Sequence, residues 1–297
     1  MNQGTLGQPG PQAETAAPDT PPAPMMVQAF GLTDPGRVRP GNEDHFLVAD
    51  LSRTLRVRQT SLPQAVSQQG RSRGHVLLVA DGMGGHAAGE VASALTVETV
   101  ETVVVELLRR FSNLQEADEH GILADLREAV RQADARIAEE VALHPELAGM
   151  GTTLTLAFAS GSRLFVIHAG DSRCYLLRGG ELHRLTEDHT VVAEMVDRGM
   201  ITAEDARHHK LRHVVTNVLG GGQAGVRVDV QRVALEAGDV VLLCSDGLTD
   251  MLDDGRIAAI LAAEAGPEAA CTRLVAEANE AGGRDNVTAV VARFEAA

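Results

Sequence analysis

The sequence predicts an α+β fold, and three observations carry this prediction. Two amphipathic helical stretches come first, a run of short apolar strands with glycine turns follows, and two further helices precede a last strand. Strands that are grouped in this way, rather than each alternating with a helix, are typical of antiparallel sheets. We therefore expect an antiparallel meander between two pairs of helices along the chain.

The first helical stretch runs from Glu90 to Arg110. It is acidic at its start and basic at its end, which suits the helix dipole, and its apolar residues can share one face. The second stretch has apolar residues at spacings of three and four: Leu126, Val130, Ala133, Ile137 and Val141. Each stretch therefore predicts a helix with one buried side.

Apolar runs bounded by turn residues predict the strands. These are Thr152–Ala159, Leu164–His168, Cys174–Arg178, Leu182–Leu185, Val226–Val233, Val240–Cys244 and Val287–Phe294. Before the last strand, Ile257–Ala265 and Pro267–Ala281 have the pattern of helices. Two irregular segments interrupt the rhythm, residues 51–75 and residues 188–225, the second with a short helix around Val191–Asp197.

The composition indicates one soluble globular domain, which we place at residues 26–297. The chain has 297 residues, 44% hydrophobic and 23% charged. Residues 1–25 hold six of the eleven prolines and no Lys or Arg, so we expect a disordered proline-rich tail rather than a secretory signal. Three scattered cysteines and the lack of a membrane-length apolar run favour a cytoplasmic protein without a membrane span.

Acidic residues recur where predicted strands begin or end. Asp81 follows the apolar run 76–80 and Asp246 follows the strand that ends at Cys244; similar fragments are Asn42-Glu43-Asp44 and Arg284-Asp285-Asn286. Gathered carboxylates repel unless they are neutralised, and hard divalent cations are the commonest neutraliser. The pattern predicts a multi-carboxylate metal site, although Asp-Gly and Asp-Asn pairs also form ordinary turns. The net charge of −15 agrees with such a site and argues against binding nucleic acid.

Six motifs occur in an order and spacing that resemble one known family. They are Arg39-Pro40-Gly41-Asn42-Glu43-Asp44, Asp81-Gly82-Met83-Gly84-Gly85-His86, Met150-Gly151-Thr152-Thr153, Gly170-Asp171-Ser172-Arg173, Ser245-Asp246-Gly247-Leu248-Thr249-Asp250 and Asp285-Asn286-Val287-Thr288. From about Val27 to Phe294 the chain resembles the metal-dependent serine/threonine protein phosphatases of type 2C, or PPM, in their bacterial form. The resemblance implies a four-layer α-β-β-α sandwich with two central antiparallel sheets flanked by helix pairs. It also implies that residues 188–225 form a mobile flap segment beside the active site.

The same resemblance implies a core site for two Mn²⁺ or Mg²⁺ ions. Asp81 would bridge both ions, and the backbone carbonyl of Gly82 would bind one of them. Glu43, Asp246 and Asp285 would complete the other. Two such ions can neutralise a phosphoryl group and generate the attacking hydroxide.

Four further residues receive roles by resemblance. Asp44 would orient a water, Asp171 would hold a third, weaker ion with help from Asp250, and Arg39 would grip the phosphate as a bidentate fork. From the residues alone, Asp171 could instead cap a turn and form ion pairs. Asp44 and Asp250 could equally serve only structural hydrogen bonds.

Several histidines and one methionine bear on the chemistry. Met83 stands where eukaryotic relatives carry a histidine thought to protonate the leaving group, and a thioether cannot donate a proton. We expect His86, close by among glycines, to be packed or capping rather than catalytic. His209 and His213 have the i, i+4 spacing of a metal pair but lack a third ligand in sequence, so we expect solvated histidines. Gly220 to Gly225 formally matches G-x-G-x-x-G, but a strand-like run follows, so we expect a flexible hinge.

Residues 51–75 form a basic insertion in an acidic protein. The segment contains no acidic residue and five arginines: Arg53, Arg56, Arg58, Arg71 and Arg73. Arginine recognises phosphate and acidic partners, so we hypothesise that the insertion docks a phosphorylated or acidic protein. A solvated hairpin whose arginines balance surface acids is the alternative.

Together these features predict an enzyme that hydrolyses phosphoserine and phosphothreonine in proteins by a metal-activated water. Its partners would be phosphorylated proteins and a cognate serine/threonine protein kinase that it opposes. No cysteine has an arginine six residues on, which excludes a covalent cysteine mechanism. The alternative is a catalytically silent phosphoprotein-binding module on the same fold, which loss of a ligand would favour.

Overall fold

The structure is a computed structural model and describes residues 25–54, 69–84, 88–110, 119–221 and 225–297. Of Arg53, Arg71 and Arg73 only the backbone is described. The expectations for the tail, for Arg56 and Arg58, and for His86 lie outside the described residues. No helix within the described ranges is long and apolar enough to cross a membrane.

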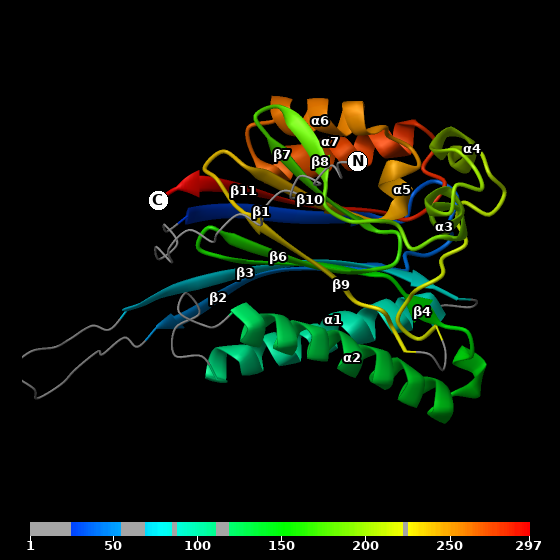
Figure 1. Cartoon of the computed structure of the whole chain (residues 1–297), viewed down its shortest axis with the longest axis horizontal. Coiled ribbons are helices and arrows are strands. Elements are labelled where there is room, and N and C mark those ends of the chain that lie inside the picture. The colour runs from blue at the N-terminus through cyan, green and yellow to red at the C-terminus, as the bar shows by residue number, and fades with distance from the viewer. Residues whose placement is uncertain (1–24, 55–68, 85–87, 111–118, 222–224) are drawn as a thin grey trace, which may run out of the picture.

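Two antiparallel sheets form the centre of the molecule (Figure 1). The strands of the five-stranded sheet are, in spatial order, β1 (Met25–Asp34), β11 (Val287–Ala296), β10 (Val240–Cys244), β7 (Arg173–Arg178) and β8 (Glu181–Arg184). Those of the six-stranded sheet are β2 (Asp44–Thr54), β3 (Gln69–Met83), β5 (Leu154–Ser160), β6 (Arg163–Ala169) and β9 (Asp229–Ala234), with β4 (Gly151–Thr152) paired to the end of β3.

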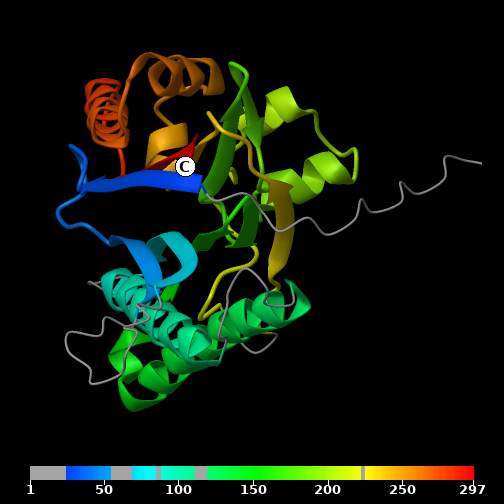
Figure 2. The same cartoon turned by 90° about the vertical axis from the view of Figure 1, so that its left-hand side faces the viewer.

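Helices cover the outer faces of both sheets, as Figures 1 and 2 show. Helices α1 (Ala88–Arg110) and α2 (Glu119–Leu143) lie against the six-stranded sheet, and the short helix η1 (Pro145–Leu147) follows them. The five-stranded sheet is covered by α5 (Asp246–Thr249), α6 (Asp254–Ala263) and α7 (Pro267–Glu280). The flap segment carries α3 (Val191–Asp197) and α4 (Ala203–Arg207) at one end of the sandwich. The expected four-layer α-β-β-α fold is confirmed.

Three apolar cores separate the four layers, and the central strands contribute to two of them. In β3, Val76 and Leu78 pack toward the helices, whereas Leu77 and Val79 pack between the sheets. Because successive side chains of a strand point to opposite faces, a strand buried on both sides must be apolar throughout. Each such side chain contributes about 1.5–3 kcal/mol by leaving water. This burial explains the uninterrupted apolar run that precedes Asp81.

The structure corrects two strand boundaries. The strand expected at 152–159 is broken at Thr153, because β4 pairs with the end of β3 and an isolated bridge joins Thr152 to Leu219. The strand expected from Val226 begins at Asp229. The Asn217 side chain accepts a hydrogen bond from the Arg227 N–H and donates one to the Arg227 carbonyl, so these two groups do not pair with a strand. Neither the backbone pairing of Thr152 nor the side-chain contact of Asn217 is visible in an apolar pattern.

The segment 51–75 is more regular than expected. Strands β2 and β3 extend into it and pair as far as Thr54 opposite Gln69, with a register shift after Ser52. The described part of the segment therefore consists of two paired antiparallel strands rather than irregular chain. The β-ladder can continue there because its hydrogen bonds join backbone N–H and C=O groups, which polar residues also carry.

The flap segment contains the expected short helix, α3. Its C-terminal end is hydrogen-bonded to α2. Gly220 has a φ of +76°, which favours glycine, and its N–H donates to Asp134 Oδ1 at 2.7 Å. Residues 222–224, the centre of the expected flexible hinge, lie outside the described residues.

Candidate metal centre

Strand pairing brings the acids together from distant parts of the chain. The register of β2 and β3 sets Asp44 opposite Asp81, at the end where Glu43 enters the sheet. Asp246 begins α5 directly after β10, and Asp285 lies just before β11, which pairs with β10. Residues more than 240 positions apart therefore meet at one end of the sandwich.

A pocket of about 420 Å³ opens at this point. Every predicted site residue except Asp44 lines it: Arg39, Glu43, Asp81, Gly82, Asp171, Asp246, Asp250 and Asp285. Met83 and two residues of the flap segment, Arg212 and His213, line it as well. The sequence motifs thus converge on a single polar cavity.

Asn286 holds the loop that carries Glu43. Its side-chain oxygen accepts from the Glu43 N–H at 2.8 Å, and its Nδ2 donates to Gly41 O at 2.8 Å. Ser93 of α1 adds a hydrogen bond from its hydroxyl to Glu43 O at 2.6 Å. Sequence reasoning missed these supporting roles, although Asn286 stands within one of the six motifs.

Asp44 is 3% exposed and makes structural hydrogen bonds. Its Oδ2 accepts from Ser245 Oγ at 2.7 Å and from Thr288 Oγ1 at 2.6 Å. Its Oδ1 is buried without a protein partner. Burial raises the pKa of Asp44 to about 7, although these two hydrogen bonds lower it. The contacts match the structural role left open for Asp44, and they leave one oxygen to receive a bound water or ion.

Asp81 is held through its backbone. Its N–H donates to Thr153 Oγ1 at 3.0 Å, and its carbonyl accepts from Thr153 N at 2.9 Å and from Thr152 Oγ1 at 2.9 Å. Burial raises the pKa of the Asp81 carboxyl well above its usual value, and the negative charges of nearby aspartates raise it further. A carboxylate in this environment requires a cation or a proton.

Gly82 is a position where no side chain fits. A Cβ there would lie 2.2 Å from the carbonyl oxygen of Gly89, in the first turn of α1. The end of β3 can therefore approach the helix closely only because both residues are glycines. This contact positions the Gly82 backbone at the wall of the pocket.

Arg39 reaches over the acids from the loop before β2. Its Nη2 donates to Asp285 Oδ2 at 2.6 Å, and its side chain is 53% exposed. The hydrogen bond to Asp285 raises the pKa of Arg39 above its ordinary value. An exposed guanidinium beside the carboxylates can meet an entering anion.

Asp171 is 8% exposed, and the two residues that follow it make structural contacts. Neighbouring Ser172 shares a 2.7 Å hydrogen bond with Thr153, and Arg173 binds Asp188 through two nitrogens at 3.0 and 2.7 Å. Burial, followed by the charge of Asp246, raises the pKa of Asp171 well above its usual value. The ion pair of this motif belongs to Arg173, so Asp171 itself is left to face the pocket.

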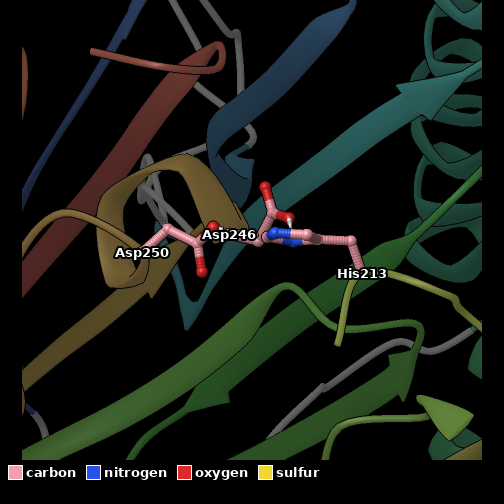
Figure 3. A group of neighbouring side chains, drawn as sticks. All are labelled: His213, Asp246 and Asp250. Atoms are coloured by element: carbon pink, nitrogen blue, oxygen red, sulfur yellow. Dashed lines mark ion pairs between the residues drawn. The ribbon is translucent and has the colours of Figure 1, made fainter. Parts of the chain in front are cut away.

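His213 is exposed, as expected of a solvated histidine, but it also lies close to two acids. Its Nδ1 lies 3.5 Å from Asp250 Oδ2 and 3.8 Å from Asp246 Oδ2. Figure 3 shows the three side chains next to one another. His209 instead accepts a hydrogen bond from the Leu211 N–H and does not share this cluster. The fold of the flap segment brings His213 to acids that follow it by more than thirty residues. No local spacing could have revealed this contact.

The residues fit a hard divalent cation. Three buried or part-buried carboxyls, Asp44, Asp81 and Asp171, have pKa values that are raised by burial and by the charges of neighbouring aspartates. The unpartnered Oδ1 of Asp44 adds an acceptor that the protein does not satisfy. Carboxylate and carbonyl oxygens are the donors that Mg²⁺ and Mn²⁺ prefer.

Comparison with known proteins places the chain in a family. The family model described as protein phosphatase 2C matches residues 59–278. The chain belongs to the protein phosphatase 2C family.

Individual relatives support this family assignment. The serine/threonine protein phosphatase PstP of Mycobacterium tuberculosis is 43% identical over 73% of this chain, which spans only 40% of that relative's length. The serine/threonine phosphatase stp of Listeria welshimeri is 33% identical over 87% of this chain and 92% of its own. A crystal structure of the PstP catalytic domain in complex with two manganese ions superimposes with a TM-score of 0.71 and 36% identity, covering 91% of this chain and 99% of that one.

Proposed function

We propose that the protein is a metal-dependent phosphatase that hydrolyses phosphoserine and phosphothreonine in proteins. The observation that carries the proposal is the convergence of Glu43, Asp81, Asp246 and Asp285 with Arg39 around one pocket. The serine/threonine phosphatases among the relatives and the manganese-bound structural neighbour support it. In the cell the activity would oppose a serine/threonine protein kinase.

The carboxylates would hold two Mn²⁺ or Mg²⁺ ions, with Asp81 between them and the Gly82 carbonyl as a further donor. When bound, such a pair supplies charge neutralisation for a phosphoryl group and an activated water. Asp44 would hold a water through its free Oδ1. Asp171, with Asp250, would hold a third and weaker ion.

Arg39 would bind the phosphate of the substrate. Its guanidinium offers parallel donors that match two phosphoryl oxygens, and its exposure lets a protein substrate reach it. Met83 lines the pocket but cannot donate a proton, so the leaving group must be protonated by another donor, such as a water.

A catalytically silent binding module would need a lost ligand. Each predicted core ligand instead lines the pocket, and no observation on the described residues favours the silent module. We therefore retain the proposal that the protein is an enzyme.

The decisive assay measures phosphate release from a phosphothreonine peptide by the purified protein with Mn²⁺, with Mg²⁺ and with chelator. We expect release with either metal and none with chelator. Asp81→Asn, which keeps the shape of the side chain, is the matched control and should be inactive. Lack of release under every metal condition would refute the proposal.

A further inference from the structure

Two arginines beside the pocket have no acidic partner. Arg37 lies in the turn after β1, Arg284 lies in the loop before β11, and both are exposed. Within the part of the chain that the structure describes, neither guanidinium forms an ion pair, although the net charge of the protein is −15. Arg284 also lines the pocket. The charge of both arginines is therefore available to a ligand.

Backbone contacts hold these two arginines close together. The pairing of β1 with β11 sets Asp34 opposite Val287, so the turn after β1 meets the loop before β11. The Arg37 N–H donates to Gly283 O at 2.7 Å. A Cβ at Gly283 would lie 2.8 Å from Arg37 Cγ, so the stem of Arg37 packs against the residue that precedes Arg284. Arg37 and Arg284 therefore lie at one edge of the pocket, which we call the basic edge.

The acids of these two turns already have other partners. Asp34 Oδ1 accepts from the Gly36 N–H at 2.8 Å and from Asn279 Nδ2 at 3.0 Å. Asp285 Oδ2 accepts from Arg39 Nη2 at 2.6 Å. The positive charge of the basic edge is thus not compensated locally. Exposed cations that flank a phosphate site raise the local concentration of anionic groups.

We propose that the basic edge binds a second phosphoryl group of the substrate, on a residue close to the one that is hydrolysed. A phosphoryl group carries about two negative charges, and guanidinium groups match its oxygens in charge and geometry. The inference rests on the proposed function, in which Arg39 binds the phosphate that is released. The preferred substrates would be protein segments that are phosphorylated at two neighbouring residues.

The position of the basic edge limits the spacing of the two phosphorylated residues. The Cα atoms of Arg37 and Arg39 are at most about 7 Å apart, because each residue spans no more than about 3.6 Å. Arg284 directly precedes Asp285, the partner of Arg39. In an extended peptide, side chains two positions apart point to the same face and are separated by about 7 Å. We therefore expect the second phosphoryl group two residues from the first.

A purely balancing role is the competing explanation. The two arginines could offset repulsion among the carboxylates of the pocket without touching a ligand. They would then act on every phosphate that enters the pocket. Their replacement would change kcat/KM by the same factor for substrates with one and with two anionic groups. The ratio of the two kcat/KM values therefore separates the explanations.

The test compares two peptides of one sequence on the full chain with Mg²⁺. Both carry one phosphothreonine, and the second peptide also carries a non-hydrolysable phosphonate analogue two residues before or after it, so that each peptide releases one phosphate. We expect the doubly charged peptide to be preferred roughly fivefold in kcat/KM, mainly through KM, because two exposed charge pairs bind it more tightly. The preference should shrink at high salt, which screens exposed charges.

Replacement of both arginines should remove the preference. In the double variant Arg37→Gln, Arg284→Gln the two kcat/KM values should become equal. Arg127→Gln is the matched control, because Arg127 is an exposed arginine of α2 that does not line the pocket. It should keep the preference. A glutamate in place of the phosphonate carries one charge and should give a smaller gain.

Three results would overturn the proposal. They are the absence of a preference in the wild type, a preference that survives the double replacement, and a gain from glutamate equal to that from the phosphonate. The last would show that the basic edge does not distinguish a phosphoryl group from a carboxylate.

Hydrolysis of the singly phosphorylated peptide separates this inference from the proposed function. Hydrolysis of both peptides with equal kcat/KM refutes the role of the basic edge and retains the phosphatase. If neither peptide is hydrolysed, the phosphatase is refuted, and fluorescence anisotropy with the same peptides and Mg²⁺ tests the basic edge. Tighter binding of the doubly charged peptide, lost in the double variant, would then retain the binding site alone, and equal binding would refute it.

Discussion

At the scale of single residues, the site combines groups that burial makes unfavourable in their charged form. Asp81 is held through hydrogen bonds of its backbone, and the loop of Asp171 is held by the hydrogen bond between neighbouring Ser172 and Thr153. The fold therefore supplies the energy that keeps them together. Such stored repulsion is common where a cation completes a site.

Asp81→Asn and Asp246→Asn should abolish turnover and leave the fold intact. Each change removes one ligand charge, and the loss of repulsion among the remaining acids should make the metal-free protein at least as stable as the wild type. Phosphopeptide turnover and thermal unfolding in chelator measure the two effects. Wild-type activity in Asp81→Asn would contradict the assigned site.

Arg39→Ala should chiefly raise KM for a phosphopeptide. The lost guanidinium contacts ground state and transition state alike, so kcat should change little. Arg39→Lys keeps the charge without the planar fork, so its KM should lie between those of the wild type and Arg39→Ala. Steady-state kinetics distinguishes these cases, and a decrease confined to kcat would argue against a binding role.

At the scale of elements, motifs at strand ends predicted which acids come together at the pocket, because strand pairing is regular. Asp44 and Asp81 face each other by register alone. The positions of His213, Asn217 and Asn286 could not be predicted, because they depend on how the flap segment and loops cross the sandwich. Side-chain hydrogen bonds between distant elements leave no periodic pattern in a sequence.

Strand β6 contains a buried histidine that should affect stability. His168 Nε2 donates a hydrogen bond to Glu187 O at 3.0 Å, and its Nδ1 shares a 3.0 Å hydrogen bond with Thr155 Oγ1. Burial, with His189 beside it, lowers the pKa of His168 from 6.5 to about 4. The unfolded chain binds a proton at His168 more readily than the folded protein does. The free energy of unfolding should therefore decrease as pH falls from 6.5 to 4, by about 3 kcal/mol from this histidine.

His168→Gln keeps both hydrogen-bonding ends and removes the titrating group. The difference in unfolding free energy between wild type and variant should therefore shrink or reverse as pH falls through this range. Urea unfolding at several pH values measures it. A difference that does not depend on pH would show that His168 is not the group responsible.

The hairpin of β2 and β3 carries the basic insertion, and its docking role stays a prediction. Changing Arg53, Arg56 and Arg58 to Glu should lower kcat/KM for a phosphoprotein several-fold, more at low salt, and spare p-nitrophenyl phosphate. The small ester is the internal control, because it needs no docking surface. Equal effects on both substrates would support the solvated hairpin instead.

At the scale of the whole molecule, the four-layer sandwich was predictable from the order of helices and strands together with the family resemblance. Its three cores follow from apolar runs that fill both faces of β3 and β10. The same architecture gathers the strand ends, and with them the acids, at one edge. Stability and metal binding should therefore be coupled throughout the domain.

Removal of metal should expose that coupling as a dependence on pH. Burial raises the pKa of Asp44 from 3.8 to about 7 and also raises those of Asp81 and Asp171, so the folded state binds protons that the unfolded chain releases. Stability is thus lost as pH rises through 7, by roughly 1 kcal/mol from Asp44 alone between pH 6.5 and 8, a range above the titration of His168.

Bound Mn²⁺ should reverse this dependence, because it binds the ionised carboxylates and competes with protons. At one hundred times its dissociation constant, a single ion adds about 2.7 kcal/mol. Urea unfolding at pH 6.5 and 8, in chelator and in Mn²⁺, measures all four states. We expect the protein in chelator to be more stable at pH 6.5 than at pH 8. The stability that Mn²⁺ adds, relative to chelator at the same pH, should be larger at pH 8. An equal gain at both pH values would mean that Mn²⁺ binds away from these buried acids.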